Sequence, residues 1–218
     1  MTHWQPQAII FDMDGLLVDS EKVWHIAESE IIESRGHEYT ADVRTAILGL
    51  RVDEFMTVLH DHYGLPETVE ALCNELNARM LTLIPEMVKP HSGANELVAW
   101  VQQQGLPTAI ASSSPLAMID SVVELMGWGE VFKVRCTAED EARGKPAPDV
   151  YLAAARALGV PPADCLALED SPNGARSAVG AGMVCYAVPD PNFAKKEAFE
   201  GITPYVFDSL NVVLDDLR

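Results

Sequence analysis

The stretch QAIIFDMDG at residues 7–15 guides the interpretation of the whole chain. It begins as a short apolar run and stops abruptly at two carboxylates, Asp12 and Asp14, followed by Gly15. A short apolar run bounded by turn residues is typical of a buried strand in a parallel sheet. Residues 7–11 are therefore predicted to form the first strand, with Asp12 and Asp14 at its carboxyl end.

Apolar runs alternate with helical periodicity in the second half of the chain. Further strands are predicted at residues 107–111, 165–168, 183–188 and 205–207. Helices are predicted at residues 94–104, from 112–115 to about 127, and at 147–158, 173–181 and 210–217. Strands that alternate with helices predict a parallel sheet with helices on both faces. The predicted fold class is α/β, with a Rossmann-like sheet core.

The segment between the first strand and residue 88 breaks this alternation. Helical patterns cover residues 20–36, with Ser20 as the predicted N-cap, and residues 52–63 and 67–84, whereas no strand pattern appears. We expect a small all-helical cap domain of residues 19–87, inserted after the first strand over the carboxyl edge of the sheet. The catalytic core is predicted to comprise residues 1–18 and 88–218.

The charge balance limits the possible partners. The chain carries 15 basic and 33 acidic residues, a formal net charge of −18. Such a surface repels nucleic-acid backbones and anionic lipids, so we expect neither as a partner. A small phosphorylated substrate would need a local positive site, and a divalent cation would be attracted by the negative field.

Cysteine spacing and the N-terminal residues bear on the compartment. The four cysteines form no C-x-x-C pair, and the chain begins without a basic or long apolar segment. We expect reduced thiols, no membrane span and a cytoplasmic location. Without a heptad pattern or an apolar edge in the sequence, we expect a monomer.

Residues that could take part in binding or catalysis follow three of the predicted strands, and one more lies in a loop. They are Asp12 and Asp14, Ser112, Ser113 and Ser114, Glu169 and Asp170, and the loop residue Lys145. Each has an ordinary alternative, because Asp and Gly favour turns, serines cap helices and most lysines are solvated. However, ligands of open α/β sheets bind at the carboxyl ends of the strands, and these residues would meet there.

The residue types at this edge suit phosphoryl transfer. Crowded carboxylates repel one another, and a bound Mg²⁺ relieves that repulsion while it binds a phosphate oxygen. Asp12 could then attack phosphorus, and Asp14 could protonate the leaving oxygen and later activate water. Ser112 and Lys145 would hold the transferring oxygens.

Four ordered stretches resemble the motifs of the haloacid dehalogenase superfamily. They are Asp12–Ser20, Ala111-Ser112, Gly144–Asp149 and Leu168–Gly174, and the resemblance extends over essentially the whole chain. The branch that the chain resembles is the β-phosphoglucomutase-like group, and within it the sugar-phosphate phosphatases that act on hexitol or 2-deoxyglucose 6-phosphates. The resemblance implies a Mg²⁺-dependent phosphatase that hydrolyses small phosphomonoesters through an aspartyl-phosphate.

The resemblance also implies roles for the motif residues. Asp12 would be the nucleophile and Asp14 the acid/base, while Ser112, Ser113 and Lys145 would bind the phosphoryl group. The metal would be bound by the Asp12 carboxylate, the Asp14 backbone carbonyl and Asp170, assisted by Glu169. The dehalogenases of the superfamily lack the second aspartate, so Asp14 argues for phosphoryl chemistry.

Two alternatives remain at this stage. A β-phosphoglucomutase would return the phosphoryl group to the sugar, but that family has a cap histidine where this chain has Trp24. The neighbouring His25 would point about 100° away on a helix, which weakens the mutase hypothesis. A binding protein that had lost the chemistry would be expected to lack Asp12, Asp14, Lys145 or Asp170, and all four are present.

Three cap residues are candidates for substrate binding. Arg51 would meet a distal group of the substrate or be a surface arginine at a helix start. Glu21 and Trp24 would face the entrance of the site if the first cap helix is oriented as in the family. Trp24 would stack on a sugar or belong to the core.

Overall fold

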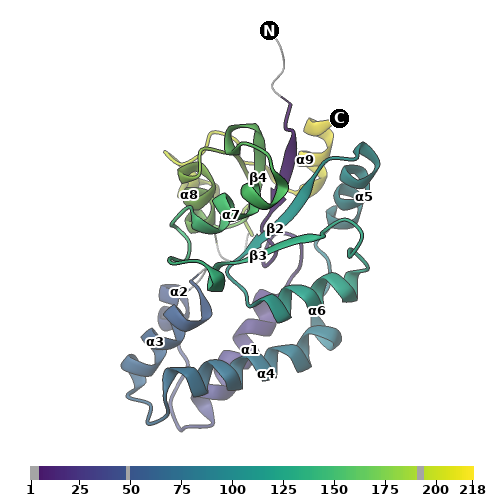
Figure 1. The fold of residues 1–218 in the computed structure, drawn as a ribbon. Coiled ribbons are helices and arrows are strands. Elements are labelled where there is room, and N and C mark those ends of the chain that lie inside the picture. Colours follow the sequence, from purple (N-terminus) through teal and green to yellow (C-terminus); the bar gives the residue numbers. More distant parts are fainter. Residues whose placement is uncertain (1–4, 48–49, 191–193) are drawn as a thin grey trace.

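The computed structural model describes residues 5–47, 50–190 and 194–218 (Figure 1). Five parallel strands form one sheet in the order β3-β2-β1-β4-β5. Their bounds are β1 (Ala8–Phe11), β2 (Thr108–Ser112), β3 (Val134–Thr137), β4 (Cys165–Glu169) and β5 (Val184–Ala187). The strand order reverses at β1, and such a switch point opens a crevice for ligands at the carboxyl ends. The predicted α/β parallel sheet is confirmed.

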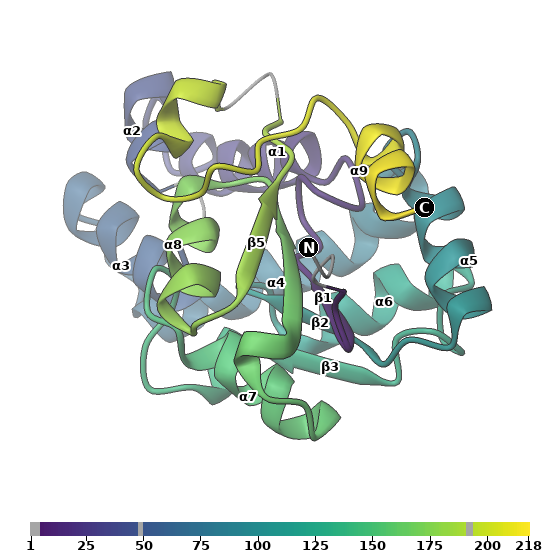
Figure 2. The ribbon, with the colours of Figure 1, turned by 90° about the horizontal axis from the view of Figure 1, so that it is seen from above.

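Alternate side chains of the strands pack on opposite faces of the sheet. Ile9 and Phe11 belong to one buried cluster, which includes residues of α5 (Ala94–Gln104), α6 (Leu116–Met126) and α9 (Leu210–Leu217). Ala8 and Ile10 belong to a second cluster with α7 (Asp149–Leu158) and α8 (Pro172–Gly180). Seen from above, α7 and α8 lie on one side of the strands and α5, α6 and α9 on the other (Figure 2). The sheet is therefore a buried middle layer.

Four helices, and no strand of the sheet, occupy the described residues between β1 and α5. They are α1 (Glu21–Glu33), α2 (Ala41–Ile47), α3 (Val52–Tyr63) and α4 (Val69–Met87). Figure 1 shows them gathered beyond the end of β1 that is opposite to the N-terminus, at the carboxyl edge of the sheet. The chain enters and leaves this group side by side, because Asp19 N donates to Lys89 O and His91 N to Leu17 O, each at 2.9 Å. The division into a core and a cap of residues 19–87 stays a prediction.

Three elements differ from the sequence-based expectation. Strand β3 was not predicted because Val-Arg-Cys-Thr is an edge strand with three half-buried residues and no apolar run. Helix α2 was not predicted because Ile47 is its one buried residue, which leaves no apolar stripe. The predicted strand at 205–207 is wrong: Val206 forms a single bridge with Ala187. Across the described ranges, no helix has the length and apolar character that a membrane crossing requires.

Candidate active site

A cavity of about 320 Å³ lies between the carboxyl edge of the sheet and helices α1–α3. Its wall includes most of the residues singled out from the sequence, namely Asp12, Asp14, Glu21, Trp24, Ser112, Ser113, Lys145 and Asp170. Glu169 lies behind this wall, fully buried and in contact with Lys145. Arg51 is a second candidate that does not line the cavity. The strand ends thus bring residues from distant parts of the chain to one site.

Lys145 is buried, with 4% of its surface exposed, so the solvated-lysine alternative is wrong. Its Nζ donates to Asp12 Oδ1 at 2.5 Å, to Glu169 Oε1 at 2.7 Å and to the Ala111 carbonyl at 3.0 Å. Burial opposes the charge of the ammonium, but the carboxylates of Asp12 and Glu169 outweigh it and raise the pKa of Lys145. The side chain is therefore a fixed positive charge beside Asp12.

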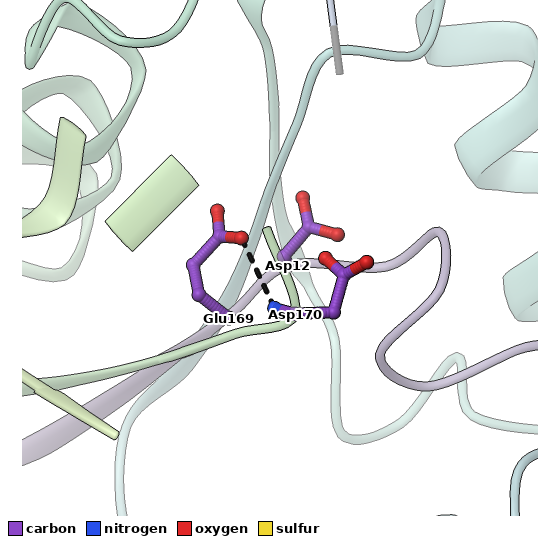
Figure 3. A group of neighbouring side chains, drawn as sticks. All are labelled: Asp12, Glu169 and Asp170. Atoms are coloured by element: carbon purple, nitrogen blue, oxygen red, sulfur yellow. Dashed lines mark hydrogen bonds between the residues drawn. The ribbon is translucent and has the colours of Figure 1, made fainter. Parts of the chain in front are cut away.

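Asp12, Glu169 and Asp170 form a carboxylate cluster at the ends of β1 and β4 (Figure 3). One oxygen of each lies within 4.8 Å of the others. Burial raises the pKa values of Asp12 and Asp170 well above the usual range, and the neighbouring carboxylates raise them further. A single ammonium cannot balance three ionised carboxylates, and a bound cation would offset the remaining charge. Hard oxygen donors at this spacing fit Mg²⁺.

Two glycines allow the carboxylates to lie where they do. A Cβ at Gly174 would overlap the Glu169 carboxylate, and a Cβ at Gly15 would overlap that of Asp170. Gly15 also has a φ of 78°, a conformation that residues with a side chain rarely adopt. Both glycines belong to the sequence motifs, and their role is close packing against the carboxylate cluster.

The Asp14 carboxylate accepts hydrogen bonds from four side chains. Oδ1 accepts from Ser20 Oγ at 2.6 Å and from Trp24 Nε1 at 3.3 Å. Oδ2 accepts from Ser114 Oγ at 2.7 Å and from Ser112 Oγ at 3.3 Å. Ser20 and Trp24 lie at the start of α1, whereas Ser112 ends β2 and Ser114 follows it. Asp14 is thus held from both sides of the cavity.

Helix capping does not explain the serines. Ser20 stands at the N-cap of α1, but its side chain makes no capping bond and instead donates to Asp14. Helix α6 begins after Pro115 and also lacks a side-chain cap, so the capping alternative for Ser112 to Ser114 is wrong. Ser112 Oγ accepts from the Ser114 N–H at 3.0 Å, and Ser113 lines the cavity.

Sequence reasoning missed Tyr151 and Ser171, two residues that support Glu169. The Tyr151 hydroxyl donates to Glu169 Oε1 at 2.8 Å, and Asp170 N and Ser171 Oγ donate to Oε2 at 3.2 and 3.3 Å. Figure 3 marks the bond from Asp170 N. Burial, followed by the charge of Glu169, raises the pKa of Tyr151 well above its usual range, so its hydroxyl stays a donor. In the sequence, Tyr151 reads only as an apolar residue of a helix.

The cap side of the cavity is partly acidic and partly apolar. Glu21 and Glu28 of α1 line it, and Arg44 of α2 lies between them, with Nη2 2.9 Å from Glu21 Oε2 and Nε 3.7 Å from Glu28 Oε2. The Tyr39 hydroxyl donates to Glu28 at 2.7 Å. Burial raises the pKa of Glu21 to about 7. The charged groups that act on Glu21 are Arg44, which opposes this rise, and Asp14, Glu28 and Asp190, which add to it.

Trp24 and Arg51 have identifiable contacts. Trp24 is 8% exposed, packs edge-to-face on Phe55 and donates its indole N–H to Asp14. Arg51 precedes α3, where its guanidinium binds Asp53 through Nε at 2.6 Å and Nη2 at 2.8 Å. Its Nη1 donates to the carbonyls of Ala138 and Glu141 at 3.1 and 3.0 Å. In this conformation Arg51 ties the start of α3 to the loop after β3, and substrate binding by Arg51 stays a prediction.

Two phosphatases are similar to this chain in sequence over most of its length. Hexitol phosphatase B of Escherichia coli (strain K12) is 37% identical over 187 residues, which cover 84% of each chain. A probable pseudouridine-5'-phosphatase of Drosophila melanogaster is 33% identical over 196 residues, covering 86% of this chain and 84% of its own.

Solved structures extend the likeness to three dimensions. A putative β-phosphoglucomutase from Thermotoga maritima superimposes with a TM-score of 0.75 at 26% identity, over 97% of this chain and 99% of the other. The family model described as haloacid dehalogenase-like hydrolase matches residues 6–182, which include all four motifs. The chain belongs to the haloacid dehalogenase-like hydrolases.

Proposed function

We propose that the protein is a Mg²⁺-dependent phosphatase that hydrolyses sugar phosphates and related small phosphomonoesters through an aspartyl-phosphate on Asp12. Phosphoric monoester hydrolysis is the activity named in both curated relatives, and the family is one of hydrolases. The observation that carries the finer proposal is the position of Asp12. Its carboxylate lies against the buried Lys145 ammonium, beside Asp170, in the cavity that Asp14 also lines.

In the first step, an Asp12 carboxylate oxygen forms a bond to phosphorus while the ester P–O bond breaks. The leaving oxygen takes a proton from Asp14, which must enter this step protonated. In the second step, water attacks the phosphoryl group, Asp14 takes its proton, and the bond between Asp12 and phosphorus breaks to release inorganic phosphate. Asp14 can serve both steps because the proton lost in the first is regained in the second.

Other residues of the cavity hold the transferring group. The Ser112 hydroxyl at the end of β2 and the Lys145 ammonium beside Asp12 are fixed donors, so little reorganisation is needed when charge develops on the phosphoryl oxygens. Asp12 and Asp170 would bind Mg²⁺ directly, with the Asp14 carbonyl as a further ligand. Glu169, occupied by Lys145 and Tyr151, would orient this group. When bound, Mg²⁺ neutralises part of the carboxylate charge and allows a phosphate dianion to approach.

The alternative is a phosphosugar mutase, because a putative β-phosphoglucomutase from Thermotoga maritima has a similar structure. In the mutase branch a cap histidine stands where this chain has Trp24. An indole N–H donates a hydrogen bond but cannot exchange a proton as an imidazole does. Trp24 contacts Asp14 through that N–H, which favours hydrolysis over return of the phosphoryl group to the sugar.

Phosphorus NMR of the products tests the proposal. The purified protein with Mg²⁺ is incubated separately with glucitol 6-phosphate and with β-glucose 1-phosphate. We expect stoichiometric inorganic phosphate, abolished by Asp12→Asn and by removal of the metal. Conversion of β-glucose 1-phosphate to glucose 6-phosphate with little free phosphate would show a mutase, and full activity of Asp12→Asn would refute the nucleophile.

A further inference from the structure

The cap side of the cavity carries negative charge that the phosphoryl-transfer steps do not use. Glu21 and Glu28 lie seven residues apart on α1, about two helical turns, and so project from the same face. Both line the cavity and share the single guanidinium of Arg44. Two carboxylates on one arginine leave the group negative whenever both are ionised.

In the part of the cavity wall that the structure describes, no positive charge is available to a second anionic group of a substrate. Among the described residues that line the cavity, Lys145 alone carries a permanent positive charge, and its ammonium contacts Asp12 and Glu169 at the phosphoryl end. The Arg51 guanidinium contacts Asp53 and two backbone carbonyls outside the wall. A second phosphate or a carboxylate placed against the cap would meet acceptors and like charge.

The remainder of this wall suits the carbon skeleton of a polyol. Thr45 of α2 also lines the cavity, and its hydroxyl donates to the Ala41 carbonyl at 2.8 Å. The apolar side chains of the wall are Trp24, Ile47, Leu50, Val52 and Phe55. Carboxylates accept hydrogen bonds from hydroxyl groups, while apolar side chains pack against C–H faces. A sugar or hexitol presents both kinds of surface.

We propose that this wall, with Glu21 as its specificity-determining residue, selects esters whose leaving group is an uncharged polyol or sugar and rejects esters with a second anionic group. The rejected classes are bisphosphates and phosphorylated carboxylic acids. This inference rests on the proposed function, since the phosphate of the substrate must sit at Asp12 for the leaving group to reach the cap. The physical cause is like-charge repulsion at low solvent exposure, where an uncompensated pair of charges is costly.

A matched pair of esters isolates the effect. Glucitol 6-phosphate and 6-phosphogluconate have the same carbon chain and phosphate and differ at C1, which is a hydroxymethyl group in one and a carboxylate in the other. We expect kcat/KM to favour glucitol 6-phosphate by about tenfold or more, the size of one like-charge contact at partial burial. In Glu21→Gln this ratio should fall severalfold, mainly through a lower KM for 6-phosphogluconate.

Two further variants control the test. Glu33→Gln makes the same change of charge on an exposed position of the same helix and should leave the ratio unchanged. Thr45→Lys adds a positive charge to the wall at an exposed position and should lower the ratio even if Glu21→Gln does not fold. A wild-type ratio near one, or equal ratios in wild type, Glu21→Gln and Thr45→Lys, would overturn the inference.

Binding separates this inference from the proposed function. Calorimetric titration of the Asp12→Asn variant with each ester, in Mg²⁺, measures selectivity without turnover. If the variant bound glucitol 6-phosphate selectively but the wild type hydrolysed neither ester, the phosphatase would be refuted and the role of Glu21 would be kept. Equal binding and equal hydrolysis of the two esters would keep the phosphatase and refute the role of Glu21.

Discussion

Lys145→Met is the substitution whose effect the structure specifies most directly. Methionine approximates the length of the lysine side chain but removes the ammonium that contacts Asp12, Glu169 and the Ala111 carbonyl. Two carboxylates with 6% and 0% exposure then lose their shared partner. We expect the variant to be destabilised and inactive for separate reasons, the first electrostatic and the second the loss of a phosphoryl-binding group.

The magnitude follows from the burial of the group. Removing one partner of a buried ion pair costs about 3–5 kcal/mol, because the remaining charge stays in a poorly solvated place. Two carboxylates share this partner, which favours the upper half of that range. Since domains of this size are stable by about 5–15 kcal/mol, the loss is large enough to measure and small enough to leave a folded fraction.

Urea unfolding in EDTA at pH 7.5, followed by circular dichroism, measures the free energy of unfolding. Lys133→Met is the matched control, because Lys133 pairs with Glu130 at the surface with 71% of its side chain exposed. An exposed pair of this kind contributes about 0–1 kcal/mol. If Lys145→Met lost no more stability than Lys133→Met, the buried carboxylates would not depend on the ammonium and the reasoning would be wrong. Mg²⁺ should reduce the difference in unfolding free energy between the wild type and Lys145→Met. It should leave the difference between the wild type and Lys133→Met unchanged.

Three other predictions follow from the same geometry. Gly174→Ala should lower the free energy of unfolding by about 1–3 kcal/mol and weaken Mg²⁺ binding, because the new methyl group overlaps the Glu169 carboxylate. Equal Mg²⁺ affinities of the variant and the wild type would contradict this. Mg²⁺ should raise the Tm of the wild type, since a ligand that binds only the folded state stabilises it, and Asp170→Asn should abolish most of that rise in a thermal scan with and without metal. Because the pKa of Glu21 is raised to about 7, its negative charge appears as the pH rises from 6 to 8. The preference for glucitol 6-phosphate over 6-phosphogluconate should therefore increase over this pH range. A ratio independent of pH would exclude Glu21 as the source of the preference, and Glu21→Gln should show such a ratio.

Much of the site could be predicted from the sequence because parallel strands share one direction. Once residues 7–11 and 165–168 are identified as strands of one sheet, Asp12 and Asp170 must leave it at the same edge. The parallel sheet and the helices on both faces followed from the alternation of patterns. The same logic missed β3, whose side chains show neither an apolar run nor a clean alternation.

The remaining contacts depend on packing that has no local signature. Ser20 looks like a helix cap, and Ser114 could be placed only at a strand end or a helix start, yet both donate to Asp14 across gaps of 6 and 100 residues in the chain. Tyr151 looks like an apolar residue of α7, but its hydroxyl supports Glu169. These contacts join residues that are distant in the chain and arise from tertiary packing. Single-residue propensities carry no information about that packing.

The register of β1 against β4 explains why the carboxylate cluster is compact. Phe11 pairs with Leu168, and the Asp12 N–H donates to the Leu168 carbonyl at 2.9 Å, so Asp12 and Glu169 continue the two strands at the same level. Asp170 is one residue further, and Gly15 leaves space for its carboxylate. A slip of one residue would turn every side chain of β1 to the opposite face and separate Asp12 from Lys145 and the β4 carboxylates. The alternating burial of β1 in two apolar clusters opposes such a slip, so the packing of Ile9, Ile10 and Phe11 also fixes the position of the proposed nucleophile.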